Sequence, residues 1–127
     1  MNAQKRLEIL LETHKREIEL IDTKGREYTF GAEVGNDLDT LANFKNVGAR
    51  LGLDAMEVWG VYFLKHADAI FTYLKHPDRD LSEPIFGRID DARTYLGLLE
   101  CLIREKQSML EVEKPKGNKD GNNDNKW

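Results

Sequence analysis

The chain has 127 residues, a length that fits one domain able to bury a core without disulfide or metal staples. Its composition of 40% apolar and 33% charged residues is typical of a globular protein and excludes a chain disordered throughout. The net charge of -4 argues against binding to the backbone of duplex nucleic acid, which needs clustered lysine and arginine. The single cysteine cannot form an internal disulfide, and this favours a cytoplasmic protein.

The first predicted helix covers Asn2 to Lys24 and ends at Gly25. Charged residues recur every few positions along it, so we expect neither a signal peptide nor a membrane span. Its apolar side consists of Leu7, Leu10, Leu11, His14, Ile18 and Ile21.

A glycine-punctuated stretch, residues 25–37, predicts a structured loop before a short second helix. Asp37 or Asp39 is expected to cap that helix, and Gly52 to end it. Its apolar side consists of Leu41, Phe44, Val47 and Leu51.

A third helix is predicted by the clearest boundary signal in the chain. Asp54 and Glu57 have the spacing of a capping box, and the apolar pattern that follows runs to about Lys75. Its broad inward face consists of Trp59, Tyr62, Phe63, His66, Ile70 and Tyr73.

A fourth helix follows a polar turn. Ser82 is expected to cap it, Pro84 is tolerated in its first turn, and the pattern ends near Met109. The predicted buried face consists of Ile85, Ile89, Ala92, Leu96 and Leu99.

These elements predict an all-α fold, a compact bundle of about four helices in a single domain over residues 1–112. Residues 113–127 form a polar tail that we expect to be disordered. The third and fourth helices carry more apolar surface than a small monomer hides easily. A homodimer or tetramer formed by helix packing is therefore expected.

Acidic side chains recur along the third and fourth predicted helices. Between antiparallel helices they would offer oxygen ligands for one or two magnesium ions, which also bind substrate phosphates. Such a site could activate water for attack on a phosphoanhydride. The candidate carboxylates are Glu57, Asp68, Glu83, Asp90 and Asp91.

Structural explanations compete with this magnesium site. The capping box accounts for Glu57, and the positive end of a helix dipole accounts for Glu83. Lys65 and Asp68 have the spacing of an ordinary surface ion pair.

Two further alternatives concern the residues around this acidic stripe. Asp90 and Asp91 point about 100° apart on a helix, so only one of them faces the site, and the other has Arg88 or Arg93 as a candidate partner. His66 on an aromatic face is more typical of a buried, hydrogen-bonded histidine than of a metal ligand.

Four segments resemble, in their order along the chain, small bacteriophage and prophage proteins related to the MazG-like, all-α nucleoside triphosphate pyrophosphohydrolases. The resemblance covers roughly residues 24–103. The segments are KGREYTFG, LANFKNVGARLGLD, VYFLKHADAI and GRIDDARTYLGLL. The matching residues are Lys24, Tyr28, Asn43, Phe44, Lys65, Asp91 and Tyr95.

The resemblance implies an oligomeric helical domain that binds a nucleotide through magnesium and splits a triphosphate into monophosphate and pyrophosphate. It implies that Asp91 and Glu83 are metal ligands and that Lys65 contacts phosphate. It places Tyr28 and Asn43 near the base or sugar. Tyr95 joins them in the substrate-binding set.

The chain departs from the family in its acids. The signature Glu-x-x-Glu on one helix and Glu-x-x-Asp on the next is absent from the expected places, and Gly87 stands where relatives often have an acid. Two alternatives to an enzyme therefore stay open. One is a non-catalytic helical module that holds a nucleotide or inhibits a host protein, and the other is a purely structural oligomer.

Overall fold

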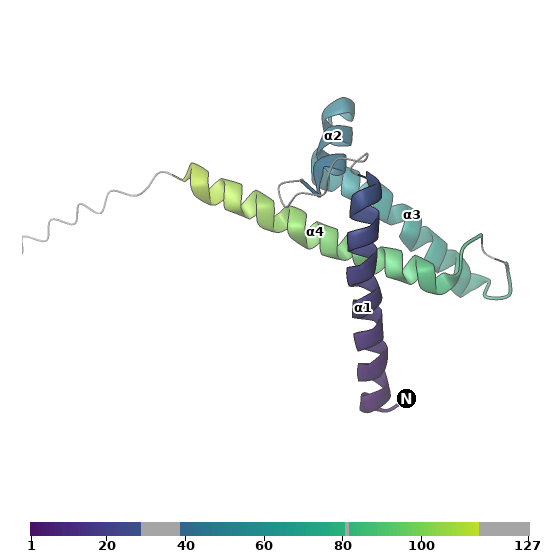
Figure 1. The fold of residues 1–127 in the computed structure, drawn as a ribbon. Helices are drawn as coiled ribbons and strands as arrows, with labels where there is room; N and C mark the ends of the chain where they lie inside the picture. Colours follow the sequence, from purple (N-terminus) through teal and green to yellow (C-terminus); the bar gives the residue numbers. More distant parts are fainter. Residues whose placement is uncertain (29–38, 81, 115–127) are drawn as a thin grey trace, which may run out of the picture.

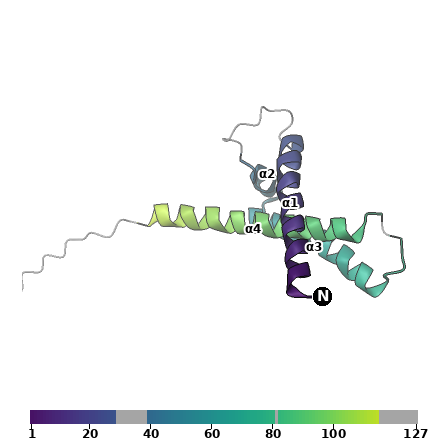
Figure 2. The same ribbon diagram turned by 60° about the horizontal axis from the view of Figure 1, so that its bottom comes forward.

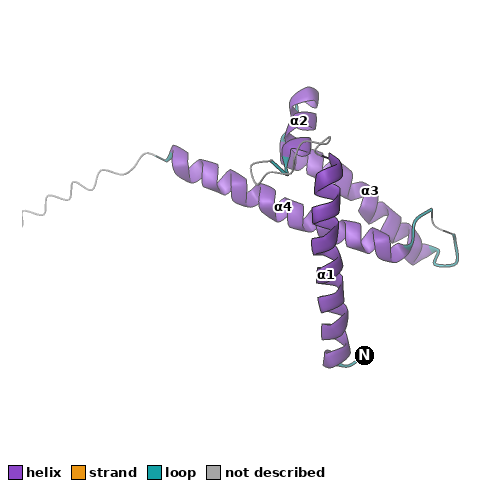
Figure 3. Cartoon of the chain, viewed as in Figure 1, coloured by secondary structure: helices purple, strands orange, loops and turns teal. Residues whose placement is uncertain are grey.

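The computed structural model describes residues 1–28, 39–80 and 82–114, with the side chains of 22–28 left out, and these described residues form four helices and no strand. The all-α class predicted from the sequence is confirmed for them (Figure 3). The helices are α1 (Ala3–Tyr28), α2 (Ala42–Leu51), α3 (Ala55–Lys75) and α4 (Ile85–Glu113).

The α3 and α4 helices run in opposite directions and form the largest helix interface (Figures 1 and 2). The short α2 helix packs on the first half of α3. The α1 helix crosses α4, and by its described residues it contacts no other helix. The N-terminal half of α1 therefore projects past α4 (Figure 1).

The capping box at the start of α3 is confirmed. The backbone N–H of Met56 donates to Asp54 Oδ1 at 2.8 Å, and the backbone N–H of Asp54 donates to Glu57 Oε2 at 2.8 Å. The predicted ends of the two middle helices are also confirmed. Gly52 ends α2 in the left-handed conformation with φ of 69°, and α3 ends at Lys75.

The ends of the outer helices differ from the prediction. Helix α1 continues through Gly25 to Tyr28, since one glycine costs a helix interior only about 1 kcal/mol. Ser82 is not the cap of α4, because Pro84 holds that position with an extended backbone, φ -57° and ψ 141°. Helix α4 also runs past Met109 for another turn.

The core lies where α2, α3 and α4 meet. The ring of Phe44 makes edge-on contacts with Tyr62 of α3 and Tyr95 of α4, each at a centroid distance of 6.2 Å. One aromatic side chain of α2 thereby joins the other two helices. The fully buried apolar side chains of the described residues are Leu41, Phe44, Val58 and Leu102.

A surface ion network holds α2 to α4 beside this core. The Lys45 ammonium lies 2.6 Å from a carboxylate oxygen of Asp39 and 2.6 Å from one of Glu105. The hydrogen bond with Asp39 raises the pKa of Lys45, and the same bond lowers the pKa of Asp39. Asp39 also accepts the backbone N–H of Leu41, but it is not the cap predicted for α2, because Leu41 holds that position without a side-chain cap. Asp37, the other predicted cap, lies outside the described residues.

The apolar side of α1 is mostly not the side that packs on α4. The apolar residues assigned to it are largely exposed, at 50% for Leu7, 63% for Leu11 and 69% for Ile18. Thr13 is buried instead, and its hydroxyl donates to the backbone oxygen of Ile9 at 2.7 Å. The side of α1 that is least exposed carries Thr13 together with Leu10 and Leu20.

The predicted buried face of α4 is also shifted. Leu96 is 51% exposed, whereas Leu102 is buried and Leu98 packs against the core. The reason is that α3 and α2 present aromatic rings to the side of α4 that carries Tyr95, and Leu98 and Leu102 follow Tyr95 on that side at helical spacing.

Three predictions, on the loop, the tail and the domain division, involve residues that the structure describes only in part. Most of the predicted loop at 25–37 and nearly all of the predicted tail at 113–127 lie outside the described residues. The division into one domain and a tail therefore stays a prediction.

None of the helices in the described part of the chain combines the length and apolar character of a membrane span.

Truncation of the central aromatic ring tests the position of the core. Phe44→Ala should lower the free energy of unfolding by about 3–5 kcal/mol in urea titrations, because the ring is 4% exposed and its loss leaves a cavity. Phe86→Ala is the matched control, since this ring is 73% exposed and its removal should change stability by only about 0.5 kcal/mol. Equal losses in both variants would contradict this core.

Candidate functional site

A group of ionisable side chains lies between α3 and α4. We name it the α3–α4 polar cluster, and it consists of His66, Glu83, Arg88 and Asp91. His66 Nδ1 lies 3.8 Å from Asp91 Oδ2, and Arg88 Nε lies 3.4 Å from Glu83 Oε2. The side chains of His66 and Arg88 are only 12% and 14% exposed. Spacing by three residues puts Arg88 and Asp91 on one face of α4.

Aromatic rings separate the cluster from the core. The centroids of the Tyr95 and His66 rings lie 4.8 Å apart, and the Tyr95 ring also contacts the ring of Phe44. Across the same interface the indole N–H of Trp59 donates to the backbone oxygen of Tyr95, and within α3 the Trp59 ring stacks on Phe63 at 4.8 Å. The contacts of Trp59 and His66 with Tyr95 join α3 to α4 where His66 lies opposite Asp91.

His66 has an unsatisfied ring nitrogen. Its Nδ1 is buried and makes no hydrogen bond within the described residues, since 3.8 Å to Asp91 is too long for one. A buried polar atom without a partner costs about 1–3 kcal/mol. Such atoms are rare in folded proteins, and this one marks the cluster as a candidate site for a polar ligand.

The protonation of His66 follows from its surroundings. Burial lowers the pKa of His66, and the nearby positive charges of Arg88 and Lys65 lower it further. The carboxylates of Asp91 and Glu83 act in the opposite direction without reversing the shift. The imidazole is therefore neutral at neutral pH and offers one donor and one acceptor.

The predicted magnesium ligands lie at different places in the structure. Asp91 and Glu83 belong to the cluster. Glu57 lies at the start of α3 in the capping box, and Asp68 is exposed on the side of α3 that carries the exposed Val61. Within the described residues, no three acidic, histidine or cysteine side chains form a group that could hold a metal. The magnesium ion stays a prediction.

Of the predicted substrate-binding residues, Tyr95 and Lys65 lie close to His66. Lys65 is exposed and near enough for its charge to act on His66. Asn43 is exposed on α2, next to the ring of Phe44 that contacts Tyr95. Tyr28 is the last residue of α1, and its side chain lies outside the description.

The two adjacent acids of α4 contact different helices, as their spacing predicts. Asp91 faces His66 of α3, whereas Asp90 Oδ2 lies 3.3 Å from Nε of Arg16 on α1. The partner of Asp90 is thus a residue 74 positions away rather than the Arg88 or Arg93 suggested by the local sequence. This ion pair links α1 to α4.

Sequence reasoning missed the role of Arg88 in the cluster. The sequence suggests Arg88 only as an ion-pair partner for one of the two adjacent acids. Its spacing of three residues from Asp91 nevertheless puts Arg88 and Asp91 on one face of the helix. The unsatisfied nitrogen of His66 carried no signal in the sequence, because its burial depends on how far α3 slides along α4.

The lowered pKa of His66 predicts how stability changes with pH. As the pH falls through about 6.5, the unfolded chain gains a proton that folded His66 does not, so the free energy of unfolding should decrease. His66→Gln should make this decrease shallower in urea titrations between pH 7.5 and 5.5. His76→Gln, at an exposed position, should leave it unchanged. The same slope in His66→Gln and the natural chain would refute this account.

Comparison with known families, curated proteins and solved structures found no family model, no curated protein and no solved structure that matches the chain.

Proposed function

We propose that the chain binds a nucleoside triphosphate through magnesium at the α3–α4 polar cluster and splits it into monophosphate and pyrophosphate. The observation that supports this most is the buried group of His66, Arg88 and Asp91 inside an otherwise aromatic helix interface. Buried ionisable groups seldom improve stability over apolar ones, and perturbed groups concentrate at functional sites.

The acids and bases of the cluster suit a phosphate ligand. Magnesium usually binds proteins through one or two carboxylates and completes its shell with water and substrate phosphates, so Asp91 with Glu83 would suffice. Glu83 is 54% exposed, and within the described part of the chain its contact is an ion pair of 3.4 Å with Arg88, so it can turn toward a cation. Bound magnesium would supply Lewis-acid polarisation of the phosphate.

The basic residues would neutralise phosphate charge. Arg88 is held in the interface and offers a fixed guanidinium fork, whereas Lys65 at the exposed edge offers a mobile ammonium. Tyr95, Asn43 and Tyr28 form the proposed surroundings of the base or sugar, on the basis of the resemblance. The proposal includes an origin in a bacteriophage or prophage and a cytoplasmic location.

The homodimer or tetramer expected from the sequence stays part of the proposal. Several apolar side chains of α3 and α4 are more than half exposed in the single chain, which supports packing against further copies. They include Val61, Leu64, Phe71, Leu74, Phe86 and Leu96.

A second candidate is a module of the same fold that binds a nucleotide without turning it over, or that inhibits a host protein. The position of Glu57 favours it. This carboxylate is engaged by the backbone of Asp54 at the far end of α3, so it does not join Asp91 as a ligand. With fewer carboxylates a cation is held less firmly, so the module can bind a nucleotide without hydrolysing it.

A ligand panel tests both candidates. The purified chain is heated with ribo- and deoxyribonucleoside triphosphates, with and without magnesium, and pyrophosphate is measured in the same samples. We expect one nucleotide to raise Tm by several degrees only with magnesium, and to be hydrolysed. Asp91→Asn should abolish the shift and slow pyrophosphate release about 100-fold or more, since a lost metal contact costs several kcal/mol.

Asp78→Asn is the matched control, because Asp78 is exposed in the turn between α3 and α4 and loses the same charge. It should keep both the shift and the release. A shift without pyrophosphate in any sample would replace the enzyme by the binding module. No shift with any nucleotide would refute both candidates.

A further inference from the structure

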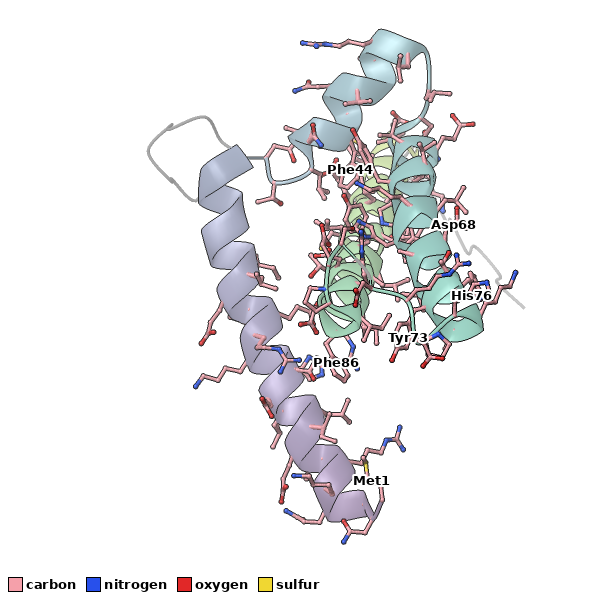
Figure 4. The ribbon with its side chains drawn as sticks, turned by 90° about the vertical axis from the view of Figure 1, so that its right-hand side faces the viewer. Met1, Phe44, Asp68, Tyr73, His76 and Phe86 are labelled. Atoms are coloured by element: carbon pink, nitrogen blue, oxygen red, sulfur yellow. The ribbon has the colours of Figure 1, made fainter. Side chains whose placement is uncertain are left out.

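The side of α1 that the sequence marks as apolar is largely exposed among the described residues of the chain. We name it the α1 outer stripe. It consists of Leu7, Leu11, His14, Ile18 and Ile21. The four apolar members are 50%, 63%, 69% and 57% exposed in chain order, and the His14 side chain is 67% exposed. Figure 4 shows the end of α1 at Met1 standing clear of α3 and α4, so this surface is accessible.

The spacing of the α1 outer stripe indicates what covers it. Its members recur at intervals of four, three, four and three residues, which is a heptad pattern with a mean period of 3.5. This period keeps a stripe facing one neighbouring helix along its length. The side of α1 on α4 is a different one, formed around Thr13 and Arg16, so α1 already has one neighbour and has room for another.

We propose that the α1 outer stripe pairs with the α1 outer stripe of a second copy of this chain, with the two helices antiparallel. In this pairing Leu7 lies beside Ile18 of the second copy, and Leu11 lies beside His14 of the second copy. Both contacts occur twice, because a two-fold axis makes an interface from one surface patch used by both copies.

Charges beside the stripe favour the antiparallel direction. The same alignment brings Glu8 of each copy next to Lys15 of the other, which forms two attractive pairs. A parallel pair in register would instead bring Lys15 next to Leu10 and gain no such pair. Glu8 and Lys15 are both exposed, so they are available at the edge of the stripe.

The length of the stripe sets the strength of the pair. Five heptad positions span little more than two heptads, fewer than the three or four that mark a long coiled coil. We therefore expect a reversible dimer whose population falls on dilution. The inference does not depend on the proposed function, since it uses no residue of the α3–α4 polar cluster.

Sedimentation velocity of the full chain over a range of concentrations tests the surface. Leu11→Glu with Ile18→Glu should raise the dissociation constant at least tenfold, with the helix content unchanged in circular dichroism because both residues are exposed. The comparison variant is Leu64→Glu with Phe71→Glu on α3, where the exposures are 60% and 61% and the added charge is equal. These two side chains belong to the packing proposed above for α3 and α4, so this variant tests that contact separately from the α1 outer stripe.

Two results would overturn the inference. One is a natural chain that is monomeric at every concentration. The other is an α1 variant that associates as strongly as the natural chain, whether or not the α3 variant does.

Disulfide trapping tests the direction in a Cys101→Ser background. Leu7→Cys with Ile18→Cys should cross-link two copies under mild oxidation, because the antiparallel pair brings these positions together. Leu7→Cys alone should not, since the two copies of residue 7 are then about 16 Å apart along the helices. Cross-linking of Leu7→Cys alone would show a parallel pair and refute the proposed direction.

Discussion

The contact of the Phe44 ring with Tyr62 and Tyr95 is the constraint on which the rest of this structure depends. It joins three helices at one point, and few other apolar side chains of the described residues are fully buried. Because Tyr95 also packs on His66, the same contact sets the register that brings Asp91 opposite the imidazole. The core and the candidate site therefore share the ring of Tyr95. A change in the position of α2 would move Tyr95 and so alter the surroundings of His66.

Local signals in the sequence predicted the middle of the chain well and its outer helices less well. The capping box of Asp54 and the left-handed Gly52 depend on neighbouring residues alone, so both could be predicted. The faces of α1 and α4 could not, because they depend on contacts between distant residues, such as Arg16 with Asp90 and Phe44 with Tyr95. Hydrophobic periodicity identifies the apolar side of a helix without saying whether its own chain or another covers it.

The candidate site was predictable only in part, for the same reason. Helical spacing separated the directions of Asp90 and Asp91, and the structure bears this out. It could not show that Glu57 lies in a cap while Glu83 lies beside Arg88, since that depends on the register of two helices. The buried nitrogen of His66 is likewise a property of the interface, so residue types and spacing do not predict it.

The hydrogen bond from Trp59 to the backbone of Tyr95 gives this molecule a built-in optical reporter. The indole bridges α3 and α4 and stacks on Phe63, so its emission wavelength depends on whether α4 rests against α3. The other tryptophan of the sequence, Trp127, lies outside the described residues, and its replacement by phenylalanine would isolate the signal. Separation of the two helices could then be followed as a red shift in fluorescence, without any attached dye.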